Sequence, residues 1–237
     1  MTNINFKKWL INRETILYAY IVVCVLYFFS ALLQLDSLEV LTKPLFLPIL
    51  FIYYLKRANN TFQYRVFVSF VFYYIGEMLV LNDEKQYYLG SVSFFLVPYV
   101  ILLYFIIKDL FRLLKVNGTK KISFVTFFVL AFLIYLYLSI MFIIDVDSDV
   151  EEVILYVYGF VLLVLSVFSI LVYILRFSAS SLFLLMTVIA FILSDMFYIF
   201  IQKVEYNWVF KSVNLISQLA SYYFFVTYSL IKAKGKR

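Results

Sequence analysis

Long apolar runs separated by short polar segments fill the chain. Each run holds roughly 18–24 residues, enough to cross a hydrocarbon core of about 30 Å at about 1.5 Å per residue. Because a helix satisfies its own backbone hydrogen bonds in lipid, we predict an all-α fold, a polytopic transmembrane helical bundle of about eight spans. The expected spans are residues 16–35, 38–55, 64–81, 87–107, 123–144, 153–175, 178–201 and 208–231.

The polar segments between these runs are short, and the longest, around residues 108–121, is too short to fold alone. We therefore expect a single integral membrane domain over residues 1–237. The second run is the least regular, because it contains two prolines and its apolar core covers only residues 45–55. A full crossing by this second run is left open.

Composition and charge favour a membrane protein over a nucleic-acid-binding one. Apolar residues make up 65% of the chain and charged residues 14%, whereas a soluble domain is about half apolar and about a quarter charged. The net charge of +6 is carried by short polar segments and the termini. That distribution is typical of topology signals and not of a nucleic-acid-binding face, so we expect no nucleic-acid partner.

Lysine and arginine residues mark one side of the membrane. Of the 20 in the chain, only Lys43, Lys85, Lys203 and Lys211 fall on the other side. The positive-inside rule therefore predicts that both termini are cytoplasmic, which requires an even number of spans. We expect a bacterial inner (plasma) membrane, with an organellar membrane as the alternative. The acidic residues 145–152 then lie outside, where we expect a solvated loop.

The chain contains no histidine and a single cysteine, Cys24. This composition excludes histidine-based triads, histidine metal sites and histidine proton shuttles. One cysteine cannot form an internal disulfide or a cysteine-ligated cluster. We expect no metal site and no cofactor.

Two carboxylic acids interrupt the apolar runs: Glu77 lies within residues 67–81 and Asp195 within residues 182–201. A charged side chain in hydrocarbon costs at least about 2.5 kcal/mol, so both should face protein or a wet cavity. Acids at such positions are functional candidates by default. We predict that Asp195 and Glu77 are catalytic residues.

Other polar residues fall at a similar predicted depth. Helical spacing puts Tyr73 on the same face as Glu77, and the predicted orientation brings the polar groups of four spans together in the outer half of the membrane. The predicted substrate-binding residues are Lys43, Lys211, Asn214, Gln218, Tyr73, Tyr198 and Ser194. Structural roles are the alternative. Glu77 would then pair with Lys43 or Lys211, and the amide side chains of the last span would link helices.

Several short motifs occur along the chain in a recognisable order. They are Lys43-Pro44-Leu45, Gly76-Glu77, Leu89-Gly90 with Phe94, Ser194-Asp195 and Gln218. In this order the chain resembles the YhhN family of eight-span membrane proteins, which includes the lysoplasmalogenases. The resemblance extends from Thr42 to about Tyr223.

Two positions depart from the family's pattern. The family usually has Gly-Asp in the third span, where this chain has Gly76-Glu77. The family also commonly carries a histidine at the position of Pro98. If that histidine takes part in catalysis, this chain is inactive, differently active, or uses another group such as Tyr99.

The resemblance implies a hydrolase that cleaves the vinyl ether bond of a lysoplasmalogen to a fatty aldehyde and a glycerophospho-amine. One protonated and one ionised carboxyl group can supply this chemistry, which needs proton transfer to carbon and attack by water. The expected partner is a membrane lipid or lysolipid substrate, and a homo-oligomer is left open. The alternative function is a catalytically inactive relative that binds or transports a lipid-like amphiphile.

Overall fold

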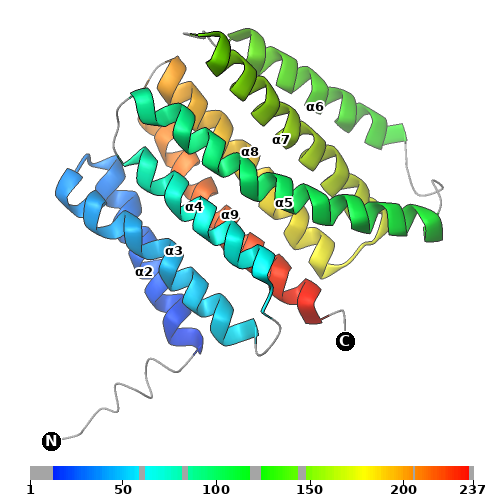
Figure 1. Cartoon of the computed structure of the whole chain (residues 1–237), viewed down its shortest axis with the longest axis horizontal. Helices are drawn as coiled ribbons and strands as arrows, with labels where there is room; N and C mark the ends of the chain where they lie inside the picture. Colours follow the sequence, from blue (N-terminus) through cyan, green and yellow to red (C-terminus); the bar gives the residue numbers. More distant parts are fainter. Residues whose placement is uncertain are drawn as a thin grey trace, which may run out of the picture.

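The computed structural model describes residues 13–58, 62–81, 85–117, 124–143, 148–204 and 206–234. These residues form eight helices and no strand, which confirms the predicted all-α bundle. Each predicted span corresponds to one helix, and successive helices run in opposite directions (Figure 1). The helices are α2 (Arg13–Leu32), α3 (Asp36–Ala58), α4 (Tyr64–Val80), α5 (Lys85–Asn117), α6 (Phe124–Ile143), α7 (Asp149–Leu175), α8 (Ala179–Lys203) and α9 (Trp208–Lys234).

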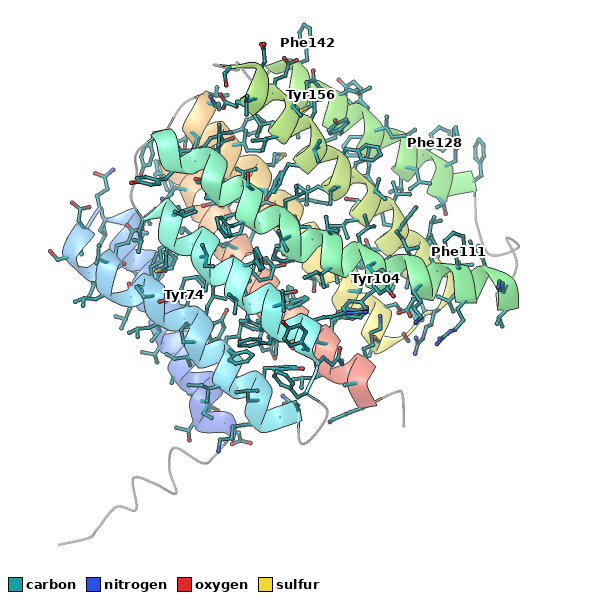
Figure 2. All side chains as sticks on the ribbon, viewed as in Figure 1. Tyr74, Tyr104, Phe111, Phe128, Phe142 and Tyr156 are labelled. Carbon is teal, nitrogen blue, oxygen red and sulfur yellow. The ribbon has the colours of Figure 1, made fainter. Side chains whose placement is uncertain are left out.

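The surface of the bundle is apolar, as a protein surrounded by lipid requires. Phe111 and Phe142 are 64% and 93% exposed, and Figure 2 shows them among aromatic side chains that point away from the helices. Among the described helices, α2, α3, α5, α7 and α8 are long and apolar enough to cross a membrane. The chain is therefore a membrane protein, and the second predicted span has the length and composition of a crossing. That α4, α6 and α9 also cross stays a prediction.

Six of the helices pack in a ring, and two lie outside it. Around the ring, α3, α4, α5, α7, α8 and α9 each pack on the next, and α9 packs back on α3. Helix α2 packs on α3 and α9, whereas α6 makes its main contact with α7. Figure 1 accordingly shows α2 and α6 at opposite margins of the bundle. Spatial order thus departs from chain order where α5 contacts α7 and α6 is displaced outward.

Local hydrogen bonds fix where helices end and begin. After α2, Gln34 has a φ of 55°, and the backbone N–H of Leu35 donates to the carbonyl of Ser30 at 2.9 Å, as in a Schellman motif. At the start of α7, the Ser148 hydroxyl accepts from the backbone N–H of Glu151 at 3.3 Å. Both devices lie at one end of the bundle, where α2, α4, α6 and α8 finish and α3, α5, α7 and α9 begin. We call it the upper end (top and left in Figure 1).

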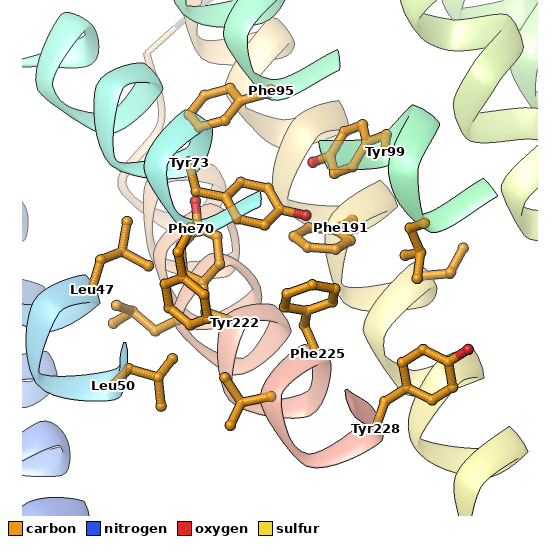
Figure 3. Close-up of a cluster of buried hydrophobic side chains, with 14 of the residues drawn as sticks. Leu47, Leu50, Phe70, Tyr73, Phe95, Tyr99, Phe191, Tyr222, Phe225 and Tyr228 are labelled. Atoms are coloured by element: carbon orange, nitrogen blue, oxygen red, sulfur yellow. The ribbon is translucent and has the colours of Figure 1, made fainter. Parts of the chain in front are cut away.

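Aromatic side chains fill the middle of the ring. Tyr73 of α4 stacks on Phe191 of α8 with ring centroids 5.6 Å apart, and it meets Tyr222 of α9 edge-on at 5.0 Å. Figure 3 shows these rings converging from three helices, with Phe225 beside them. Such pairs contribute about 0.5–1.5 kcal/mol each beyond the area they bury. We call this cluster the aromatic core, and it lies about one helical turn below Glu77, because Tyr73 precedes Glu77 by four residues.

The acidic stretch expected to form a solvated loop is partly helical and partly buried. Residues 144–147 lie outside the described residues, but residues 149–152 form the first turn of α7. Glu151 is only 4% exposed, and its carboxylate lies 2.5 Å from the ammonium group of Lys203 on α8. The expectation is therefore wrong for Glu151, because a lysine on the neighbouring helix supplies the partner that a buried charge needs.

Candidate active site

A cavity with a mixed polar wall lies inside the upper half of the bundle. It contains about 370 Å³ of empty space, part of it open to the outside, and residues of α2, α3, α4, α5, α8 and α9 form its wall. The wall consists of Tyr27, Lys43, Val80, Phe95, Ser194, Asp195, Tyr198, Lys211, Asn214, Leu215 and Gln218. We call this space the polar cavity. It brings two lysines, one carboxyl group and two side-chain amides to a single position in the fold.

A wider space adjoins the polar cavity on the side of the upper end. The two spaces share four wall residues, Val80, Tyr198, Lys211 and Asn214. The wider space adds the carboxylates of Asp36 and Glu39 from the first turn of α3, together with Gln202. We call it the vestibule. Its wall combines two acidic residues with Lys211, next to the polar cavity.

Glu77 is fully buried and is tied to two neighbouring helices. Its Oε1 accepts hydrogen bonds from Gln218 Nε2 at 2.7 Å and from the Tyr222 hydroxyl, both on α9. Its Oε2 lies 3.8 Å from Lys43 Nζ on α3. Glu77 is absent from the wall of the polar cavity, whereas Lys43 and Gln218 belong to it, so Glu77 lies one layer behind. The structure therefore shows the ion pair with Lys43 that was the structural alternative for this residue.

Gly76 makes room for an aromatic ring beside this ion pair. A Cβ atom at position 76 would lie 2.6 Å from a ring carbon of Phe95 on α5, closer than real Cβ contacts. Phe95 in turn forms part of the wall of the polar cavity. The glycine of the Gly76-Glu77 motif thus sets how closely α4 and α5 approach at the site.

Asp195 has different surroundings. Its Oδ2 accepts hydrogen bonds from the hydroxyls of Tyr99 on α5 and Tyr158 on α7, each at 2.7 Å. Two donors on one oxygen fix the rotation of the carboxyl group. Within the described part of the chain, both hydrogen bonds to the Asp195 carboxyl group end on Oδ2 and neither on Oδ1. Asp195 itself belongs to the wall of the polar cavity, so this carboxyl group is oriented by protein and adjoins open space.

Asn214 joins the two helices that carry most of the polar wall. Its Nδ2 donates to the backbone carbonyl of Ser194 at 2.8 Å and lies 3.2 Å from the Ser194 hydroxyl. This contact links α9 to α8 one residue before Asp195. Asn214 thus has the helix-linking role given as an alternative, while it also lines both the polar cavity and the vestibule.

The structure brings seven of the nine predicted site residues to one wall. They are Lys43, Ser194, Asp195, Tyr198, Lys211, Asn214 and Gln218. Glu77 lies behind that wall, and Tyr73 lies in the aromatic core. The Tyr73 hydroxyl has no hydrogen-bond partner within the described part of the chain. A role for any of the nine in binding or catalysis stays a prediction.

Three tyrosines donate hydrogen bonds to the two acids, and only one of them was a candidate from the sequence. Tyr99, the group that the sequence suggests in place of the family's histidine, donates a hydrogen bond to Asp195. Tyr158 and Tyr222, which hydrogen-bond the two acids, carried no distinguishing signal because the chain contains 22 tyrosines. Within the described residues, no three carboxylate or cysteine side chains are grouped closely enough to hold a metal ion.

The fold and the site define a helical membrane protein with a carboxyl-containing polar cavity inside its bundle. The model of the YhhN family matches residues 38–229, which begin in α3, end in α9 and so cover all or most of each ring helix. The chain belongs to the YhhN family. No curated protein and no solved structure matches it.

Proposed function

We propose that this protein is a lysoplasmalogenase-like membrane hydrolase, which cleaves the vinyl ether bond of a lysoplasmalogen to a fatty aldehyde and a glycerophospho-amine. Membership of the YhhN family, which includes lysoplasmalogenases, supports the reaction class. The observation that carries the proposal is Asp195, a carboxyl group oriented by two tyrosine hydroxyls in the wall of the polar cavity. A vinyl ether reacts with water only after a carbon atom is protonated, and an oriented carboxyl group is a suitable donor.

The proposed reaction begins when Asp195 transfers a proton to the second carbon of the alkenyl chain. The electron pair of the double bond forms the new C–H bond, and the first carbon becomes an oxocarbenium ion. Water adds to that first carbon and returns a proton to Asp195, which leaves a neutral hemiacetal. The hemiacetal hydroxyl then loses its proton, the ether oxygen gains one, and the C–O bond breaks. One water is consumed, and the products are the aldehyde and the free glycerol hydroxyl.

Glu77 acts in this proposal as a positioning residue. Of the two predicted catalytic acids, only Asp195 reaches the polar cavity, and Glu77 contacts it through Gln218 and Lys43. Because the Gln218 amide nitrogen donates to Glu77, its carbonyl oxygen is available to accept a hydrogen bond from water in the cavity. Glu77 would thus orient the attacking water through Gln218 and hold the ammonium group of Lys43 at the wall.

The head group of the substrate fits the polar cavity and the vestibule. Lys211 belongs to both walls and, with Lys43, supplies positive charge for a phosphate group. Asp36 and Glu39 supply negative charge for an ammonium group in the vestibule. Positive and negative side chains in one space complement a zwitterionic phospho-amine better than a neutral or purely anionic head group.

The distribution of charge supports a finer placement in the membrane. All eight helices would cross, residues 1–237 would form one membrane domain, and both termini would be cytoplasmic. The polar cavity and vestibule would then lie in the outer half of a bacterial inner membrane. Substrate would reach the site from the outer leaflet.

The proposal is tested by comparing vinyl-ether, alkyl-ether and ester lysolipids with the same head group, using purified protein in detergent. We expect aldehyde from the vinyl ether alone. Asp195→Asn, which keeps an oxygen for the two tyrosines, should lower kcat/KM by about 10²–10⁴-fold. The matched control is Asp149→Asn, because Asp149 is an exposed acid in the first turn of α7. Full activity of the Asp195 variant would refute the proposed chemistry.

The second candidate function is binding or carriage of a lipid-like amphiphile without chemistry. The presence of Pro98, where the family commonly has a histidine, favours it. The same assay separates the two functions, because a binding protein would retain the lysolipid and release no product. Saturable binding of all three lysolipids without product would support this candidate and overturn the hydrolase.

A further inference from the structure

A second space also borders Asp195. It lies between α6, α7 and α8 and contains about 560 Å³ of empty space, part of it open to the outside. Apart from Asp195, Ser166 and the hydroxyls of two tyrosines, its wall is hydrocarbon and thioether. Each of the three helices contributes, for example Leu136 from α6, Leu162 from α7 and Ile192 from α8. We call this space the apolar groove.

Asp195 is the single described residue that belongs to the walls of both the polar cavity and the apolar groove. The wall of the polar cavity adds lysines and amides beside this residue, and the wall of the apolar groove adds leucine, isoleucine and methionine side chains. A change of polarity at one carboxyl group matches an amphiphile at the point where its head group joins its chain. In a vinyl ether lysolipid, that point is the reacting bond.

We propose that the apolar groove holds the single hydrocarbon chain of the substrate, with the first chain carbons beside Asp195. This inference rests on the proposed function for the position of the head group, but the groove itself is assigned from its own wall. Burying a chain there removes apolar surface from water or from the head-group region, and the gain grows with each methylene that the groove covers. The groove therefore sets which chain lengths are accepted.

The length of the groove suits a chain. Its wall runs along α7 from Leu155 to Ser166, which is about 16 Å at about 1.5 Å per residue. Because α7 begins at the upper end, its part of the wall leads away from that end toward the opposite end of the bundle. A chain lying there would extend away from the head group and along the helices, as a lipid chain does in a membrane.

The position of α6 outside the ring explains why this space exists. Helix α6 makes its main contact with α7 and leaves a gap toward α8, where a ring helix would close the space. Tyr137 joins α6 to α7 in two ways: Gly159 leaves room for its ring, and its hydroxyl donates to the carbonyl of Tyr156 at 3.2 Å. A Cβ atom at position 159 would lie 2.7 Å from that ring. The groove is thus bounded on its lipid side by a helix and not by the membrane alone.

The experiment measures chain-length preference in binding, with alkyl-ether lysolipids that contain no vinyl ether to cleave. Octadecyl and dodecyl lysolipids of the same head group are titrated into wild-type protein and into Ile192→Trp, which fills the groove. We expect wild-type protein to prefer the octadecyl chain, and Ile192→Trp to lower that preference roughly tenfold or more, equivalent to about two methylenes losing their buried position. The control is Leu193→Trp, which adds the same side chain at the next residue, where the leucine faces outward and is 37% exposed.

A second pair of variants tests the same assignment if Ile192→Trp fails to fold. Leu136→Trp fills the groove from α6, and Leu138→Trp is its exposed control, since Leu138 is 58% exposed. A loss of octadecyl preference confined to the two groove variants supports the assignment. Equal preference in groove and control variants overturns it, whatever the hydrolase assay shows. Conversely, the groove variants could lose the octadecyl preference while wild-type protein releases no aldehyde from any vinyl ether. That result would support the chain-binding site and reject the hydrolase.

Discussion

Glu77 and Asp195 belong to the same polar region, yet their carboxyl groups have different neighbours. Glu77 is 0% exposed, with an amide and a tyrosine on one oxygen and a lysine near the other. Asp195 receives two tyrosine hydroxyls on one oxygen and lies between the polar cavity and the apolar groove. Both carboxyl groups link helices, but only the one that is contacted on a single oxygen and borders open space is available to a ligand.

The largest effect expected from this difference is on stability. Glu77→Leu should lower the free energy of unfolding by about 3–5 kcal/mol, because it leaves the buried ammonium of Lys43 without this counter-charge. Asp195→Asn should change stability little, since the amide oxygen still accepts the tyrosine hydroxyls. The measurement is denaturant unfolding of each variant in mixed micelles.

Two further variants define the cause of that loss. Lys43→Met combined with Glu77→Leu removes both charges and should recover much of the lost stability, as replacement of whole buried pairs often does. Glu77→Asp carries the acid that the family usually has, and it should retain both fold and aldehyde release. If the Glu77→Leu and Lys43→Met losses simply add, the two side chains do not act as a pair.

A smaller effect is expected where Gly76 brings α5 against the Glu77 side of the site. Gly76→Ala should destabilise by about 1–3 kcal/mol, because the new methyl group displaces the Phe95 ring. Gly90→Ala is the matched control, since a Cβ atom there meets only an ordinary contact at 3.4 Å from Leu79. Alanine at that helical position should be neutral or stabilising. Equal unfolding curves for the two variants would show that the Phe95 contact sets no limit on packing.

The fold could be read from the sequence to the level of helices but not of their neighbours. Apolar runs of membrane length predicted all eight described helices, because lipid permits few alternatives to a helix. The ring arrangement, with α6 outside, could not be predicted, since a helix that is apolar on every side carries no signal for which side meets protein. The apolar groove, which depends on the position of α6, could therefore not be predicted from the sequence either.

The site residues likewise divide into those that the sequence predicted and those that it did not. An isolated acid in an apolar run is conspicuous, so Asp195 was predicted from its cost in lipid. Lys43 and Gln218 were predicted from their depth in the membrane, which is similar to that of the acids. Tyr158 and Tyr222 were not, because tyrosine is common in this chain and suits both a core and a membrane interface. The different surroundings of the two acids also depended on helix packing, which spacing along one helix does not reveal.

The smallest expected effect comes from the two tyrosines that orient Asp195. Tyr99→Phe and Tyr158→Phe should each cost about 0.5–1.5 kcal/mol of unfolding free energy, the value of a hydrogen bond between neutral groups, because one donor remains on Oδ2 in each variant. The double variant should lose more than the sum, since the carboxyl group then loses both donors. Tyr135→Phe, at a tyrosine that is 68% exposed, is the control. Losses of about 1.5–3 kcal/mol for each single variant would instead indicate bonds to a charged group, and would contradict Asp195 as the resting proton donor.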